Sequence, residues 1–219
     1  MAHRIKNVNK LTLTDMIREP ETYVGLEEGL LQLPVPDEIR IGKKLLTVPQ
    51  SLDEFTGNIC YGQRLYFSKE EPNDFAIIIR FIAGYYFPQI TGERWDEEKI
   101  SGIVKNVISC NAIQLYPVSM HLVNLTGEMA EREKALLYRE PSKMEKAAGI
   151  EKLNVFSELS SLDFLRDTMK VPVSEVLQTP YNEILVRFMM AKEMYDYQER
   201  YMELLKAESE SKTYKTRKR

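Results

Sequence analysis

The stretch TPYNEILVRFMMAKEMYDYQERYMELLKA, from Thr179 to Ala207, predicts the longest helix of the chain. Thr179 can cap the first turn with its hydroxyl. Pro180 suits the first helical position, because its missing N–H has no helical partner there in any case. No glycine or proline follows Pro180 in the sequence. At about 1.5 Å per residue, this stretch makes a helix about 40 Å long.

Two apolar stripes follow helical spacing along this helix. The first stripe consists of Tyr181, Ile184, Leu185, Phe188, Ala191 and Tyr195. The second stripe, about a third of a turn away at helical spacing, consists of Met190, Met194, Tyr197, Tyr201 and Leu204. The two stripes can form one wide core face, or one core face and one face for a partner.

Earlier helices decide between these two interpretations. The predicted helices at 75–86 and 97–108 have apolar faces large enough to cover the first stripe, whereas no later helix exists to cover the second. Methionine adapts to varied surfaces and tyrosine is enriched at interfaces. We therefore predict that the first stripe belongs to the core and that the second binds a partner. The predicted partner-binding residues are Met190, Met194, Tyr197 and Tyr201.

Composition is that of a folded, soluble protein. The 219 residues are 43% hydrophobic and 29% charged, with a net charge of −3, which excludes a globally basic nucleic-acid binder. Cys60 and Cys110 stand alone, which favours two free thiols in a reducing compartment. The N-terminal segment MAHRIKNVNKLTLTDM lacks the apolar core of a secretory signal. The longest apolar run, 75–87, is too short for a bilayer and contains Arg80. We expect an intracellular protein without membrane contact.

Glycine and proline positions divide the chain into three parts. Residues 1–48 are predicted to form an N-terminal arm, because dense breakers exclude long helices between Gly25 and Pro49. We expect short extended segments there, a hairpin being one arrangement, at the periphery of the fold. Residues 49–207 form a compact multi-helix domain, and residues 208–219 form a basic, flexible tail. The predicted fold class is mostly α, with an irregular arm and a long C-terminal helix.

Local signals predict where the shorter helices begin and end. In the first half of the chain we predict a turn that Thr14 caps and Pro20 stops, a helix that Ser51 and Glu54 open with a capping box, and a buried helix at 75–86 that Pro88 ends. A helix from Asp96 to Cys110 follows, and then a connection at 111–117. The next helix starts at Pro117 or Ser119, with a break at Gly127, and the last three are predicted at 142–148, 150–159 and 161–169, where Ser161 is the cap.

No catalytic or metal-binding constellation emerges from the sequence. His121 has apolar neighbours and no second ligand at helical spacing. Cys110 lies near the end of a predicted helix, where the dipole raises a thiol pKa and disfavours a nucleophile. The glycines of TGNICYGQR lack the Gly-Lys-Ser/Thr ending of a phosphate loop. We therefore predict a non-enzymatic protein with no cofactor and no metal.

The C-terminal segment is basic and supports two interpretations. A cluster of cations can neutralise phosphates and bind nucleic acid without sequence specificity. A solvated chain end gives the same pattern, and we favour it because Tyr214 alone provides too little aromatic surface for base stacking. The residues that would carry nucleic-acid binding are Lys212, Lys215, Arg217, Lys218 and Arg219.

Two segments resemble proteins of bacteriophages. LTVPQSLDEFTGNICYGQRLYF (Leu46–Phe67) is similar to the opening of small phage proteins encoded with tail genes, in which a VP-x-S-x-x-E-x-T phrase introduces the helical domain. PYNEILVRFMMAKEMYDYQERYM (Pro180–Met202) is similar to their closing helix. The order of parts resembles that of phage tail assembly chaperones. The resemblance covers roughly Thr47 to Leu205 and leaves out the first 45 residues and the basic tail.

This resemblance implies a phage morphogenesis protein. Its expected partners are phage structural proteins of the tail, tape-measure or connector, with a homo-oligomer as a further arrangement. Its expected location is the cytoplasm of the infected cell, with the virion as the alternative. One alternative is a virion structural subunit, for example of a ring or connector, in which the irregular segment Leu26–Pro49 lies against the next subunit. Another is a nucleic-acid-binding regulator that acts through the basic tail. Nothing in the resemblance supplies catalytic residues.

Overall fold

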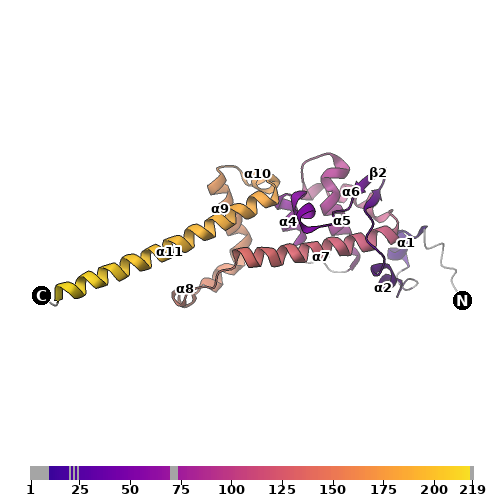
Figure 1. Cartoon of the computed structure of the whole chain (residues 1–219). Coiled ribbons are helices and arrows are strands. Elements are labelled where there is room, and N and C mark those ends of the chain that lie inside the picture. Colours follow the sequence, from indigo (N-terminus) through magenta and orange to yellow (C-terminus); the bar gives the residue numbers. More distant parts are fainter. Residues whose placement is uncertain (1–9, 20, 22, 24, 70–73, 218–219) are drawn as a thin grey trace.

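The computed structural model describes residues 10–19, 21, 23, 25–69 and 74–217. It confirms the mostly α fold, with a multi-helix body, an N-terminal region that contains short extended segments, and a long C-terminal helix that projects from the body (Figure 1). The elements are α1 (Leu13–Arg18), α2 (Leu26–Leu31), β1 (Glu38–Ile41), β2 (Lys44–Thr47), α3 (Leu52–Gly57), α4 (Tyr61–Phe67), α5 (Asp74–Thr91), η3 (Glu97–Lys99), α6 (Ser101–Ile108), α7 (Ala112–Leu137), α8 (Lys143–Ala148), η4 (Ile150–Phe156), α9 (Ser157–Met169), α10 (Val173–Gln178) and α11 (Tyr181–Arg217).

The N-terminal arm contains the predicted hairpin, but the arm is not peripheral. Strands β1 and β2 pair antiparallel, with Ile39 opposite Leu46. Because successive strand residues face opposite sides, Ile39 and Ile41 both point into the core and are buried. Leu13 and Met16 of α1 are also fully buried. The arm was expected at the edge because breakers limit its helices, yet its short apolar pieces complete the core of the body.

Capping in this region differs from the prediction. Thr12, not Thr14, caps α1, and the carboxylate of Asp15 reaches back to the Thr12 N–H to complete a capping box. The Thr14 hydroxyl instead donates to the carbonyl oxygen of Ile108 at 2.8 Å. It thereby ties α1 to the end of α6. The segment after α1 also departs from expectation, since the arm, where short extended segments were expected, contains the helix α2 (Leu26–Leu31).

Other predicted boundaries are confirmed or moved by local hydrogen bonds. Ser51 caps α3 by accepting from the Glu54 N–H at 3.3 Å, although the Glu54 carboxylate accepts from the N–H of Gln50. Asp96 caps as predicted, but it opens the short turn η3 before α6 begins at Ser101. Ser142 and Glu145 form a capping box on α8.

In the second half of the body, one predicted cap and one predicted connection are wrong. Ser161 lies inside α9, which begins at Ser157, and its hydroxyl donates to the Ser157 carbonyl. The segment predicted as a connection at 111–117 is the first part of α7, which Asn111 caps. Local patterns in these segments permit several starts, and packing selects one of them.

Two prolines predicted to end or start helices lie inside helices. Helix α5 continues past Pro88 to Thr91, and α7 includes both Pro117 and Gly127. Pro88 has no N–H to bond the carbonyl of Gly84, one helical turn earlier. The buried side chain of Gln63 replaces that donor: its Nε2 lies 2.8 Å from the Gly84 oxygen and 3.3 Å from that of Tyr85. A residue distant in sequence therefore makes the proline compatible with the helix.

Replacing Gln63 with leucine is expected to lower the free energy of unfolding by about 2 kcal/mol, because it leaves the buried Gly84 carbonyl without a donor. Gln63 Oε1 also accepts from the Cys60 N–H at 3.0 Å, and that bond is lost too. Urea denaturation measures the change. In a Pro88→Ala background, the new N–H can bond Gly84, so the cost of Gln63→Leu should fall. An equal cost in both backgrounds would contradict this role.

The core of the body surrounds α5 and α7. As predicted, α5 is central, with Ile82 and Tyr86 fully buried. Phe55 stacks on Tyr85 and Phe67 stacks on Phe81, with ring centroids 5.4 and 5.3 Å apart. Gly62 permits α4 to approach Trp95, because a Cβ at this position would lie 2.6 Å from the indole. This glycine serves close packing.

Candidate protein-binding site on the C-terminal helix

The first turns of α11 belong to the core of the body. Tyr181, Ile184 and Leu185 are buried there, as the first stripe predicts. Helices α3, α4 and α7 pack against this part of α11. The expectation that the helices at 75–86 and 97–108 cover the stripe is wrong, because α5 packs mainly on α6 and α7, and neither α5 nor α6 is a main neighbour of α11.

The start of α11 is fixed by backbone contacts with the start of α4. The Tyr181 N–H donates to the Ile59 carbonyl at 3.0 Å, and the Tyr61 N–H donates to the Thr179 carbonyl at 2.9 Å. Thr179 does not cap α11 with its hydroxyl, which donates to the carbonyl of Glu175 at 2.9 Å. These bonds hold the first turn of α11 in the body and set the direction in which the helix leaves it.

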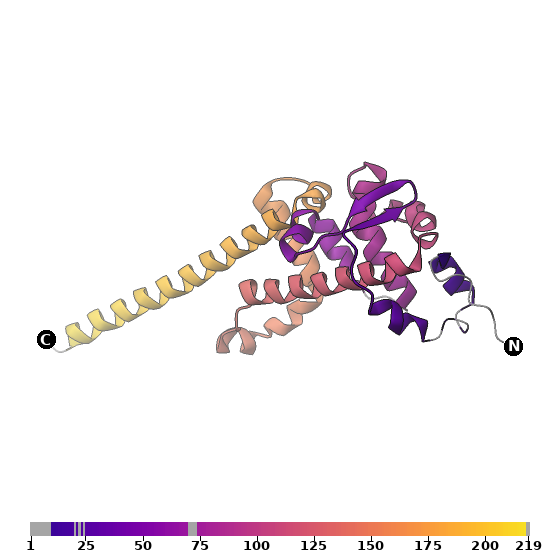
Figure 2. The same ribbon diagram turned by 45° about the vertical axis from the view of Figure 1, so that its right-hand side comes forward.

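The second stripe of α11 is exposed. Met190 is 63% exposed, Met194 57%, Tyr197 56% and Tyr201 51%. The rings of Tyr197 and Tyr201 stack on each other with centroids 6.1 Å apart. Figure 2 shows that this part of the helix extends away from the body. The structure thus leaves all four predicted residues free to contact another protein, while their binding role stays a prediction.

The exposed stripe points away from the rest of the chain. The step from Phe188 to Tyr197 is about two and a half turns at about 3.6 residues per turn, so the two side chains point to opposite sides of the helix. Phe188 packs on Tyr61 and Phe164 of the body. The stripes are therefore about half a turn apart, and the predicted third of a turn is wrong.

A polar contact between α11 and the α7–α8 connection extends the body side of the helix. Lys192 Nζ donates to the Leu136 carbonyl at 3.0 Å. The Tyr195 hydroxyl donates to the Glu145 carboxylate at 3.0 Å, and the Arg139 guanidinium lies 4.2 Å from the centre of the Tyr195 ring. Tyr195 is 43% exposed, so the last residue of the first stripe belongs to this contact and lies outside the buried core.

Glu145 is the centre of that contact. It accepts hydrogen bonds from both terminal guanidinium nitrogens of Arg139, from the N–H of Ser142 and from the Tyr195 hydroxyl. These bonds, that with Arg139 above all, lower the pKa of the Glu145 carboxyl to about 2. The ionised carboxylate therefore joins α8 to α11.

The docking of α8 on α11 is expected to weaken in acid. An unfolded glutamate has a pKa of about 4.3, so the lowered pKa favours the folded contact at higher pH. Its contribution is full above that value and is lost as pH falls toward 2. Hydrogen exchange of the α8 amides, measured between pH 5 and pH 2, should show this loss. Glu145→Gln cannot titrate and should show weak protection at every pH; wild-type-like protection in this variant would contradict the prediction.

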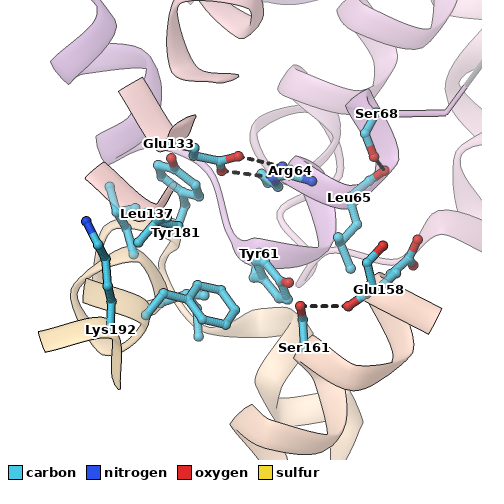
Figure 3. Close-up of a pocket in the computed structure, with 14 residues that line it drawn as sticks. Tyr61, Arg64, Leu65, Ser68, Glu133, Leu137, Glu158, Ser161, Tyr181 and Lys192 are labelled. Carbon is cyan, nitrogen blue, oxygen red and sulfur yellow. Dashed lines mark hydrogen bonds and ion pairs between the residues drawn. The ribbon is translucent and has the colours of Figure 1, made fainter. Parts of the chain in front are cut away.

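An open pocket of about 480 Å³ lies between α4, α7, α9 and α11 (Figure 3). Arg64 and Glu133 form a bidentate ion pair beside the pocket, with nitrogen–oxygen distances of 2.9 and 2.5 Å. The buried Tyr181 hydroxyl has no hydrogen-bond partner among the described residues, and burial, with nearby Glu133 second, raises the pKa of Tyr181. Lys192 and Glu158 balance the remaining charge of the lining. The Ser68 and Ser161 hydroxyls of the lining donate to the backbone carbonyls of Leu65 and Ser157.

Sequence reasoning did not find this pocket. Arg64 and Glu133 are far apart in the chain, and each fits an ordinary exposed helix position. Only the tertiary fold brings these two residues, on α4 and α7, within reach of each other. Without a fold, no spacing rule links the two residues.

The basic segment continues the helix. Helix α11 runs to Arg217, past the predicted end at Ala207. For Lys212, Lys215 and Arg217 only the backbone is described, and it is helical. Lys218 and Arg219 lie outside the described residues. The nucleic-acid hypothesis for this segment stays a prediction.

The single histidine of the body and the two cysteines have structural surroundings. His121 Nε2 lies 2.7 Å from the Pro49 carbonyl oxygen and so donates to it. Burial raises the pKa of both Cys60 and Cys110. The raised pKa of Cys110 agrees in direction with the sequence prediction, but its cause is burial and not the helix dipole. Both cysteines are free thiols.

Comparisons with known proteins give no match. No family model, no curated protein and no solved structure matches this chain. Within the part of the chain that the structure describes, each helix is too short or too polar to cross a membrane.

Proposed function

We propose that this chain is a non-enzymatic assembly protein that binds other proteins through the exposed face of α11. The observation that carries the proposal is the division of α11 into a buried part and a projecting part. Tyr181 to Leu185 anchor the helix in the body, and Met190 to Tyr201 present an apolar stripe on the side that the body does not cover. A long helix with an apolar stripe is the form that docks into a groove or pairs with another helix.

The chemistry of the stripe suits this role. Burial of methionine and tyrosine side chains is favourable, so four of them exposed on one face of a helix gain free energy when a partner covers them. Methionine adapts its shape to a partner, and tyrosine adds contact area with little loss of side-chain freedom. The contact through Lys192 and Tyr195 supports the helix beyond the core and holds the stripe outward.

The proposed biological setting is phage morphogenesis. It rests on the resemblance of Leu46–Phe67 and Pro180–Met202 to phage tail assembly proteins. In that setting the partners are structural proteins of the tail, tape-measure or connector, met in the cytoplasm of the infected cell. A virion structural subunit is the second candidate, because the same projecting helix can join neighbouring subunits in a particle.

Two mass-spectrometry experiments test the proposal. The tagged chain, purified from infected cells, should retain phage structural proteins, and Met194→Glu with Tyr197→Glu should lose them. Analysis of purified particles separates the two candidates, since an assembly factor should be absent and a subunit present in many copies. If neither self-association nor a structural protein depends on the α11 stripe, the proposal is wrong.

A further inference from the structure

We propose that the stripe on α11 pairs with the same stripe of a second copy of this chain, in antiparallel orientation. The inference rests on the proposed protein-binding role of this face and names its occupant. The stripe alternates steps of four and three residues, which is the spacing of a coiled-coil seam. The seam residues are Met190, Met194, Tyr197, Tyr201 and Leu204.

The charges beside the seam select the occupant. In heptad terms Met194 and Tyr201 take position a, while Met190, Tyr197 and Leu204 take position d. Glu193 and Arg200 then both take position g, directly before an a residue. Both are exposed, and neither forms an ion pair with a described residue. In an antiparallel pair, g positions of the two helices face each other, so Glu193 of one copy can meet Arg200 of the other.

One alignment satisfies the seam and these charges together. Placing Met194 opposite Tyr197 of the second copy also places Met190 opposite Tyr201. Each of these layers joins a methionine to an aromatic ring, a favourable contact for the thioether sulfur. Two-fold symmetry repeats each layer and gives two Glu193–Arg200 pairs. At each end, Leu204 lies opposite the aliphatic stem of Arg187. The overlap from 187 to 204 is about 27 Å long at about 1.5 Å per residue.

Other alignments bring like charges together. A shift of one heptad in one direction places Arg200 opposite Arg200, and the opposite shift places Glu193 opposite Glu193. In a parallel pair, g faces e, so Glu193 meets Gln198 and Arg200 meets Leu205, and the opposite charges gain nothing. Complementary charge therefore favours the antiparallel alignment with Met194 opposite Tyr197.

The body leaves room for this arrangement. Phe188, Lys192 and Tyr195 contact the chain's own body on the side of α11 opposite the seam. In an antiparallel pair the two bodies lie at opposite ends of the paired helices, each on its outer side. Figure 2 shows that the later part of α11 extends beyond the body.

Charge reversal tests the alignment with the full-length chain in sedimentation equilibrium. The wild type should dimerise reversibly. Glu193→Arg alone and Arg200→Glu alone should each weaken the dimer about tenfold, because each variant turns two attractions into repulsions. The double variant restores opposite charges and should return the dissociation constant to near the wild-type value. Glu203→Arg, the same charge change outside the seam, is the matched control and should change it little.

The outcomes separate this inference from the proposed function. A chain that is monomeric at all accessible concentrations overturns the self-pairing, and so do single reversals without effect or a double variant that is not restored. A monomer that still binds an identified phage structural protein through Met194 and Tyr197 overturns the self-pairing and leaves the proposed function intact. A dimer that follows the charge pattern supports both.

Discussion

Replacing Met194 and Tyr197 together with glutamate is expected to weaken protein binding through α11 at least about a hundredfold while leaving the chain folded. Each glutamate places a charge in a seam that a partner must desolvate, at a cost above about 1 kcal/mol per position. Both wild-type side chains are more than half exposed, so the free energy of unfolding should change by less than about 0.5 kcal/mol. Affinity is measured with the purified partner or by self-association, and stability by urea denaturation.

A matched variant controls for general effects of added charge. Met144→Glu with Val155→Glu changes two exposed apolar residues on α8 and η4, at 83% and 85% exposure. This pair should preserve both stability and binding. Equal loss of binding in the two double variants would show that charge, not the seam, explains the effect. Unfolding of Met194→Glu/Tyr197→Glu alone would show that the stripe belongs to the core.

Truncation of Ile184 to alanine is expected to lower the free energy of unfolding by about 3 kcal/mol, the range for a buried aliphatic side chain that leaves a cavity. Ile184 is buried with Leu65, Leu165 and Val176, where α4, α9, α10 and α11 meet. Met194→Ala, two to three turns further along the same helix, should cost less than about 0.5 kcal/mol. The two values test whether α11 changes from core element to free helix.

Urea denaturation of the two alanine variants at constant pH gives both values directly. The slope of unfolding free energy against urea should be unchanged, so the midpoint alone reports stability. A Met194→Ala cost equal to or above that of Ile184→Ala would contradict the division of α11. It would indicate that the stripe folds back onto the body in solution.

Helical periodicity is the part of the fold that the sequence predicts well. The spacing of Tyr181, Ile184 and Leu185 predicts their burial, and Met194 and Tyr197 were correctly predicted to remain uncovered. These inferences succeed because a regular helix carries each side chain to a direction set by its number alone. The identity of the covering helices was missed, because α3, α4 and α7 reach α11 through tertiary packing.

The breaker rules fail where distant residues compensate. Pro88 was expected to end α5, and it does not, because Gln63 supplies a donor to the Gly84 carbonyl. The arm was expected at the periphery because its segments are short, yet Ile39 lies in the core. In both cases the deciding contact joins residues remote in sequence, which no local pattern records.

The same reason limits prediction of the sites. The α11 stripe was found because all its residues lie on one helix. The pocket beside Arg64 and Glu133 and the Glu145 contact with Tyr195 were not found, since each joins separate elements. The self-pairing seam became visible only when the structure showed which side of α11 the body occupies.

Site-specific photocrosslinking at position 197 tests the central claim that the exposed face of α11 is where this protein binds others. A benzoylphenylalanine replaces Tyr197 in one chain and Glu203, on another side of the same helix, in a second chain. After irradiation in infected cells, the chain labelled at 197 should form one dominant adduct, with a second copy or with a phage structural protein, and the chain labelled at 203 should form little. No adduct at 197, or equal adducts at both positions, would contradict the claim.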